Sequence, residues 1–170
     1  MIYNLKLMND YRFSKMMVVS VLVMLVGCAT SRDGSARQEE LAKRVSAALD
    51  NHQFKIDVDM MNPRMWSMRH VSYGYSVEVR NDTLISYLPY FGRAYSVPYG
   101  GGKGLNFSAP IKSYTEYEKK GKRYVRIGVS NEEDTYTYKL EVFSNGKASI
   151  DVQPRERESI SYSGEFNFDE

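Results

Sequence analysis

Apolar and polar residues alternate with a period of two along most of the chain after Gln53. Residues 136–142, for example, place tyrosine, tyrosine, leucine and valine at every second position. Such alternation is typical of antiparallel strands that have one face on a core and the other in water. The strands that it predicts lie at residues 54–59, 71–80, 83–88, 125–130, 136–142, 148–152 and 160–168.

Short turn signals separate these segments. Asn145-Gly146 predicts a hairpin with a type I′ turn, in which both residues have positive φ, and residues 81–82 and 118–123 predict further hairpins. Roughly eight to ten short strands joined in this way favour an all-β fold, a small antiparallel up-and-down barrel. A two-sheet β-sandwich is the alternative, but it needs longer crossovers. A bulge at Gly164 would bend the last strand and close the barrel.

One segment before the strands has helical periodicity. Leu41, Val45 and Leu49 fall on one narrow apolar stripe, and Ser35 with Gln38 forms a capping box at the expected start. Because the stripe is narrow, we expect this N-terminal helix to plug or flank one end of the barrel.

The N-terminus carries the signals of a secreted lipoprotein. Basic residues precede an apolar run at 16–26, which is shorter than the roughly 20 residues of a membrane span. The run leads into Leu-Val-Gly-Cys, which resembles the bacterial lipobox whose cysteine is acylated. Cys28 is the only cysteine, so an internal disulfide is excluded. We expect a signal peptide at 1–27, a lipidated cysteine and tether at 28–34, and a helix-plus-barrel domain at 35–170.

The residues after Cys28 indicate a location. No aspartate follows the cysteine, and the acidic cluster of some surface-exposed lipoproteins is missing. By resemblance to bacterial sorting rules, acyl chains on Cys28 would hold the protein in the outer membrane, facing the periplasm. The alternative is a buried cysteine that ends an apolar segment.

The charge of the expected mature chain excludes one class of partner. Removal of residues 1–27 takes three basic residues and one acidic residue from totals of 23 and 21, which leaves 20 of each. A chain without net charge lacks the basic footprint of a nucleic-acid-binding protein. We therefore expect no nucleic-acid partner.

Signatures of catalysis and metal binding are nearly absent. His52 and His70 have no ligand spacing, and residues 132–134 lack the alternation of a calcium loop. The glycines at 100–104 lack the setting of a phosphate loop, and no nucleophile motif is present. We therefore expect neither an enzyme nor a metal or cofactor.

Residues 87–102 crowd four tyrosines, a phenylalanine, two prolines and an arginine into sixteen positions. Pro89 should end a strand, because it donates no backbone hydrogen bond. Residues 89–92 then predict a tight turn, and residues 93–98 an extended edge piece. Aromatic side chains at such a turn must pack onto the barrel mouth, a ligand or a partner.

Two further features bear on this aromatic segment. Trp66, the only tryptophan, lies among four methionines, in a loop that either packs over the open barrel end or covers an apolar pocket. Arg93 either binds an anionic group or forms an ion pair with Glu78 or Glu165. The candidate ligand- or partner-binding residues are Trp66, Tyr87, Tyr90, Phe91, Arg93, Tyr95 and Tyr99.

Three short stretches indicate a family. Ser-Tyr-Leu-Pro-Tyr-Phe-Gly-Arg-Ala-Tyr at 86–95, Gly-Leu-Asn-Phe at 104–107 and Ser-Ile-Ser-Tyr-Ser-Gly at 159–164 resemble an uncharacterised family of bacterial envelope lipoproteins, known only as a domain of unknown function. The resemblance covers about residues 38–168. It implies a compact, lipocalin-like barrel that is secreted or lipid-anchored, and it brings no established activity.

Two functions follow as hypotheses. The first is a lipid-anchored barrel that binds a small apolar or amphiphilic molecule at its mouth, which requires an open pocket beside the aromatic residues. The second is a structural lipoprotein whose tyrosine-rich edge binds another envelope protein, which requires an exposed aromatic patch.

Overall fold

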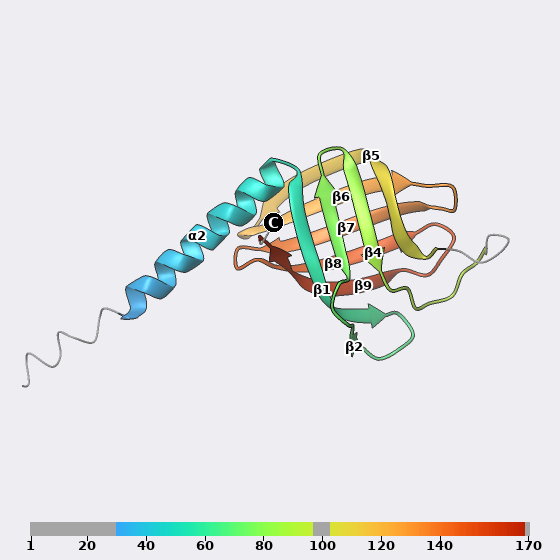
Figure 1. The fold of residues 1–170 in the computed structure, drawn as a ribbon, viewed down its shortest axis with the longest axis horizontal. Coiled ribbons are helices and arrows are strands. Elements are labelled where there is room, and N and C mark those ends of the chain that lie inside the picture. Colours follow the sequence, from blue (N-terminus) through green and yellow to red (C-terminus); the bar gives the residue numbers. More distant parts are fainter. Residues whose placement is uncertain (1–29, 97–102, 169–170) are drawn as a thin grey trace, which may run out of the picture. The chain divides into compact units, whose positions relative to one another are not determined.

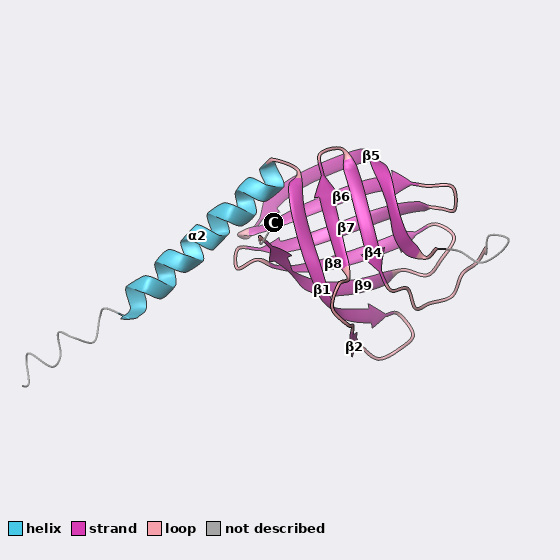
Figure 2. Ribbon diagram, in the orientation of Figure 1, coloured by secondary structure: helices cyan, strands magenta, loops and turns pink. Residues whose placement is uncertain are grey.

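Within the described residues, eight antiparallel strands close into a barrel and one helix precedes them (Figure 1). The structure is a computed structural model that describes residues 30–96 and 103–168. Figure 2 shows how strands dominate the described chain. The elements are α2 (Thr30–Asp50), β1 (Gln53–Pro63), β2 (Arg69–His70), β3 (Ser76–Arg80), β4 (Thr83–Leu88), β5 (Leu105–Lys119), β6 (Lys122–Ser130), β7 (Thr135–Phe143), β8 (Lys147–Pro154) and β9 (Ile160–Asn167).

The strand order confirms the up-and-down barrel and rules out the sandwich. The order is β1-β3-β4-β5-β6-β7-β8-β9, every neighbour is antiparallel, and β9 pairs with β1 over Lys55–Pro63. The short β2 pairs only with the far end of β1, where Met60 faces His70. One edge of β1 thus pairs with β9. The other edge pairs with β3 near the start of β1 and with β2 near its end.

The strand expected at 71–80 is shorter than predicted. Only Ser76–Arg80 pairs with β1, and residues 71–75 form a loop in which Gly74 has φ of 99°. The alternation of apolar residues is present in this loop, but Tyr73 is fully exposed. The apolar period thus extends beyond the strand, and the predicted start of this strand at residue 71 is wrong.

Residues 41–170 form one compact unit, which includes the last turns of α2. Leu49 and Val45 are buried, and Leu41 lies 3.9 Å from the position that a Cβ on Gly146 would take. The guanidinium of Arg123 on β6 bonds Asp50 at 2.6 Å and also pairs with Glu116. The apolar stripe of the helix thus packs at one barrel end, as expected. The helix begins at Thr30, five residues before the start predicted at Ser35.

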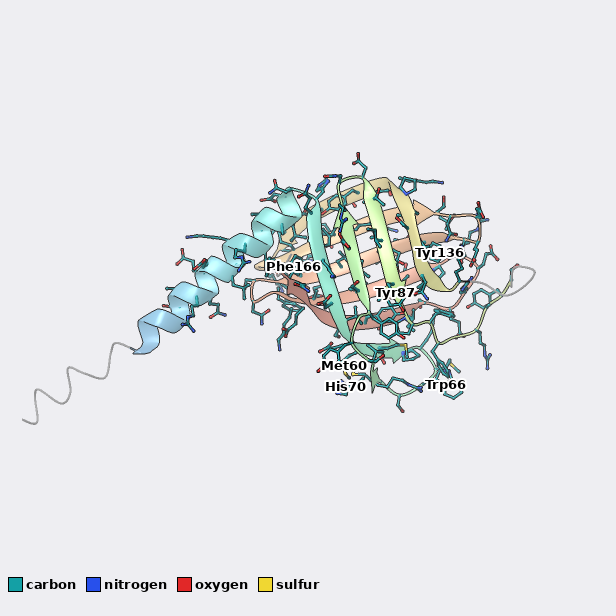
Figure 3. All side chains as sticks on the ribbon, viewed as in Figure 1. Met60, Trp66, His70, Tyr87, Tyr136 and Phe166 are labelled. Atoms are coloured by element: carbon teal, nitrogen blue, oxygen red, sulfur yellow. The ribbon has the colours of Figure 1, made fainter. Side chains whose placement is uncertain are left out.

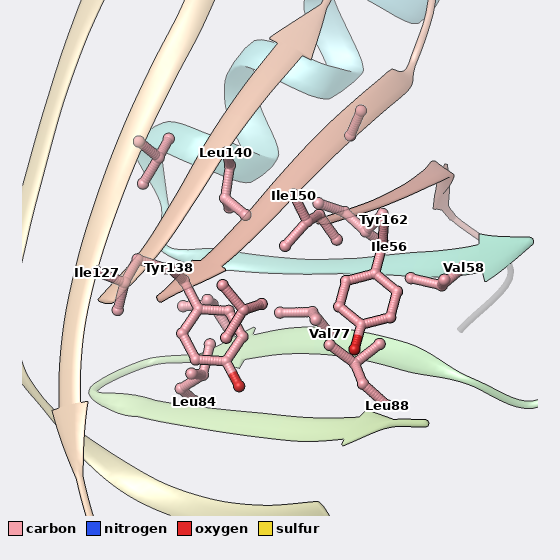
Figure 4. Packing of buried hydrophobic residues seen from close by; sticks show 14 of the residues in the cluster. Ile56, Val58, Val77, Leu84, Leu88, Ile127, Tyr138, Leu140, Ile150 and Tyr162 are labelled. Carbon is pink, nitrogen blue, oxygen red and sulfur yellow. The ribbon is translucent and has the colours of Figure 1, made fainter. Parts of the chain in front are cut away.

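Large side chains occupy the barrel interior (Figure 4). The hydroxyl of Tyr138 donates to Ser86 Oγ at 2.9 Å, and Ser86 donates to the Leu105 carbonyl at 2.7 Å. The hydroxyl of Tyr162 donates to the Pro89 carbonyl at 2.7 Å. The buried tyrosines therefore satisfy their polar ends on backbone and hydroxyl groups close to the end of β4, where the aromatic segment begins.

Two predicted backbone features, a hairpin turn and a bulge, differ in detail from the prediction. The hairpin at Asn145-Gly146 is confirmed, but only Gly146 has positive φ, and three residues join β7 to β8. This is the geometry of a type I turn followed by a bulge, rather than type I′. The bulge expected at Gly164 lies on the partner strand, at Asp59. Gly164 is needed instead because a Cβ there would overlap the Asp57 carbonyl.

No helix within the described part of the chain is long and apolar enough to cross a membrane.

Candidate binding site at the barrel rim

The end of the barrel opposite the packed helix turns carries its longer loops. The described loop residues at this end are 64–68, 89–96, 103–104, 131–134 and 155–159. Two of these loops enclose a pocket of about 410 Å³, which we call the rim pocket. Its lining residues are Met65, Trp66, Tyr90, Phe91, Gly92 and Arg93.

The loop after β1 supplies one wall. β1 ends at Pro63, and the chain returns through β2, where Arg69 pairs with Met61. Trp66 lies at the tip of this loop (Figure 3), with its ring 5.1 Å from that of Phe91 and inclined by 77°. Edge-to-face contact of this kind is the preferred geometry of aromatic pairs. The two rings therefore join loops that are distant in sequence.

Tyr90 fixes the opposite wall. Its hydroxyl lies 3.0 Å from the carbonyl oxygens of both Arg93 and Glu158, which share its single proton in a bifurcated hydrogen bond. A Cβ on Gly92 would lie 2.7 Å from this hydroxyl oxygen, so only glycine allows the close approach. Burial, and then the nearby Glu158 carboxylate, raise the pKa of Tyr90, which keeps the phenol protonated as a donor. The segment expected as a tight turn at 89–92 is thus an open bend held by side-chain bonds.

A buried ion pair lies next to the Tyr90 ring. Arg157 is 7% exposed and donates to Glu133 Oε2 at 2.9 Å. Its guanidinium carbon lies 5.8 Å from the centre of the Tyr90 ring. The other Glu133 oxygen accepts the Lys103 backbone N–H at 3.0 Å. A desolvated pair with satisfied oxygens is a rigid support, because loss of either partner would leave a buried charge.

Four of the candidate residues, Trp66, Tyr90, Phe91 and Arg93, meet at the rim pocket. Tyr87 points outward from β4 and stacks on Tyr75 at 5.3 Å, away from the pocket lining. Tyr95 is 69% exposed, and its N–H bonds the Glu156 carbonyl at 2.8 Å. Cys28 and Tyr99 lie outside the described residues.

The ion pair considered for Arg93 does not form. Glu78 pairs with Arg80, and Glu165 lies 3.8 Å from Lys147. The backbone of Arg93 is held instead, by the Glu158 carboxylate at 3.2 Å and by the Glu158 N–H at 2.9 Å. Its side chain lines the rim pocket.

Sequence reasoning missed two residues of this site. Met65 lines the pocket, and the Arg69 guanidinium carbon lies 4.8 Å from the centre of the Phe91 ring. Arg69 belongs to the two-residue strand β2, whose short length leaves no periodic signal. The only clue was its position next to the methionine-rich stretch around Trp66.

A second cavity, of about 870 Å³, lies on the outside of the barrel. Outward side chains of β1 and β9 line it, among them Asp57 and Glu165, together with the loop 70–76. Among the described residues no group of acidic, histidine or cysteine side chains could hold a metal ion. Trp66 and Met65 line the rim pocket and not this groove.

The fold and the family agree. The family model described as a domain of unknown function, DUF4251, matches residues 36–166, and the chain belongs to this family. A crystal structure of a DUF4251 family protein from Bacteroides eggerthii has a TM-score of 0.60 and 14% identity, and the match covers 77% of this chain and 89% of that one. No curated protein matches. At this identity the solved structure supports the fold alone.

Proposed function

We propose that the protein is a lipid-anchored envelope protein that binds one small amphiphilic molecule in the rim pocket. The observation that supports this proposal is the pocket itself. Its volume is in the range of small-molecule sites, and its walls consist of tryptophan, phenylalanine, tyrosine, methionine, glycine and arginine. Apolar walls with one charged side chain, that of Arg93, suit a molecule that has an apolar chain and a polar head.

The filled interior determines where the ligand would lie. Tyr136, Tyr138 and Tyr162 are at most 1% exposed inside the barrel. Barrels of eight strands are either filled by side chains or just wide enough for one small ligand. A molecule bound by this barrel would therefore lie across its mouth, against Trp66 and Phe91.

The anchor is the second part of the proposal. The apolar run and the Leu-Val-Gly-Cys sequence support acylation of Cys28, and attachment to the outer membrane on its periplasmic face. Acyl chains would hold the protein at a bilayer, and bilayers contain amphiphiles.

Native mass spectrometry of the protein extracted from its own membranes tests the binding role. We expect a bound small molecule of defined mass, and its loss in Trp66→Ala. Tyr117→Ala removes an equally exposed aromatic residue from the β5–β6 hairpin, far from the pocket, and should keep the ligand. Retention of the same mass by Trp66→Ala would place the ligand elsewhere.

A second candidate function rests on exposure. Met65, Trp66 and Met68 are more than half exposed, as is Tyr95. Exposed aromatic and methionine side chains are typical of protein interfaces. On this alternative the rim binds another envelope protein, and the extracted complex would carry a protein chain in place of a small molecule.

A further inference from the structure

The structure assigns a headgroup class to the rim pocket: we infer that it selects single-chain amphiphiles with an anionic headgroup, which Arg69 and Arg93 bind at its edge. This inference rests on the proposed binding of an amphiphile. It adds a sign of charge and a residue, Arg69, that the pocket lining alone does not include.

Hydrogen bonds fix the backbone of Arg93, whereas its side chain has no ion-pair partner among the described residues. Its N–H donates to Glu158 Oε2, and its carbonyl accepts from Tyr90 and from the Glu158 N–H. Its side chain makes no ion pair with any carboxylate in residues 30–96 and 103–168. A guanidinium on a fixed backbone loses less freedom on binding an anion than one on a mobile loop.

Arg69 approaches the same site from the other wall. Its guanidinium lies over Phe91, the ring that also contacts Trp66. It too has no ion pair among the described residues, so the aromatic face orients it while its five donors stay available. A guanidinium that stacks on a ring can still bind phosphate, sulfate or carboxylate in its own plane.

The charge around the pocket favours an anion. Other arginines of the barrel, such as Arg80, Arg123 and Arg157, each pair with a carboxylate. At the rim the Glu158 carboxylate accepts the backbone N–H of Arg93. Arg69 and Arg93 thus carry two positive charges that have no ion-pair partner among the described residues, and an anionic headgroup would pair with them. Hydrogen bonds between charged groups are the stronger ones.

The aromatic walls explain why the ligand also needs a chain. Trp66 and Phe91 would lose solvent-exposed apolar surface only if an apolar group covered them, which is favourable in proportion to the area. Inorganic phosphate alone would leave that surface exposed. The pocket thus fits an anionic head at the arginines and a chain along the rings.

Photo-crosslinking tests the headgroup. The full-length lipidated protein, in neutral phosphatidylcholine vesicles, is exposed to dodecyl probes that carry a diazirine in the chain and a phosphate, maltoside or trimethylammonium head. Labelled peptides are then identified by mass spectrometry. We expect the phosphate probe to label peptides that contain Trp66 or Phe91 about tenfold more than the trimethylammonium probe, in line with charge-assisted hydrogen bonds.

Variants separate charge from pocket shape. Arg69→Gln with Arg93→Gln should reduce that ratio to about one while maltoside labelling persists, and Arg126→Gln, an exposed arginine on β6, should leave it unchanged. Equal labelling by all three heads in the parent protein would overturn the inference and leave the pocket intact. No rim labelling by any probe would refute the proposed function as well. A parent preference that survives the double variant would exclude these two arginines.

Discussion

Trp66 and Phe91 meet edge to face, with ring centres 5.1 Å apart. One residue follows β1 and the other follows β4, and an isolated antiparallel bridge between Ala94 and Arg157 holds the loop after β4. The contact joins the two walls of the rim pocket, and the guanidinium of Arg69 lies over the Phe91 ring. Side-chain contacts thus join the two walls of the candidate site, whereas backbone pairing joins the strands of the barrel.

Replacement of Gly92 tests how the Tyr90 wall is held. In Gly92→Ala the new Cβ would lie 2.7 Å from the Tyr90 hydroxyl oxygen, so the ring must move and its two hydrogen bonds weaken. We expect a loss of about 1–2 kcal/mol in the free energy of unfolding, measured by urea denaturation. Gly34→Ala is the control and should keep or gain stability, because nothing lies within 4 Å of its Cβ position and alanine favours a helix. Equal stability of Gly92→Ala and the parent would mean that Tyr90 is not fixed in this way.

Two glycines of the barrel wall form a matched pair. In Gly164→Ala the new Cβ overlaps the backbone carbonyl of Asp57 on β1, at the seam that closes the barrel. In Gly128→Ala it overlaps only the hydroxyl of Ser113, which can rotate away. We expect Gly164→Ala to lose more than about 3 kcal/mol or to fail to fold, and Gly128→Ala to lose about 1 kcal/mol. Equal thermal unfolding temperatures for the two variants would contradict this description of the seam.

The buried tyrosines predict a loss of stability in alkali. Burial raises the pKa of Tyr138 and Tyr162 in the folded protein. Tyrosines of the unfolded chain have a pKa of about 10. Below that pH both states hold the proton and the full stability is present. Above it only the unfolded chain releases the proton, so the free energy of unfolding falls as pH rises, by up to about 1.4 kcal/mol per pH unit for each group.

Urea denaturation at a series of pH values measures this slope. Tyr138→Phe removes the contribution of one buried tyrosine and should make the slope above pH of about 10 less steep. Tyr73→Phe, which changes a fully exposed side chain, is the control. An unchanged slope in Tyr138→Phe would show that its hydroxyl titrates alike in both states.

Acylation has a direct test. Replacement of Cys28 by alanine should abolish incorporation of labelled fatty acid, because this is the only cysteine of the chain. We also expect the protein to leave the outer-membrane fraction, which density-gradient separation measures. Unchanged labelling of Cys28→Ala would refute the anchor.

Most of the barrel could be predicted because its inward side chains recur at every second residue. The exception is β5, which the alternation did not reveal. Its apolar residues keep the period from Leu105 to Ile111, but a bulge at Lys112 then shifts the phase. The opposite error occurred at 71–75, where the period continues through a loop. Periodicity reports which side chains face a core and does not report where backbone pairing begins or ends.

The rim could be predicted only in part. Trp66 and Phe91 stood out because large aromatic side chains in loops need a packing partner, and the structure brings them together. Tyr87 could not be separated from Tyr90 by sequence, since its outward direction depends on the register of β4 with β3 and β5. Arg69 was missed because its contact with Phe91 is a tertiary one between residues that lie 22 positions apart.

Quenching of Trp66 fluorescence by an amphiphile with a brominated chain tests the central claim most directly. Trp66 is the only tryptophan, so the emission reports on the rim pocket alone. With the full-length protein in neutral vesicles, we predict quenching that saturates as the amphiphile is added and that weakens strongly in Phe91→Ala. Emission that stays constant, or that declines without saturation in both proteins, would contradict a binding site at the barrel rim.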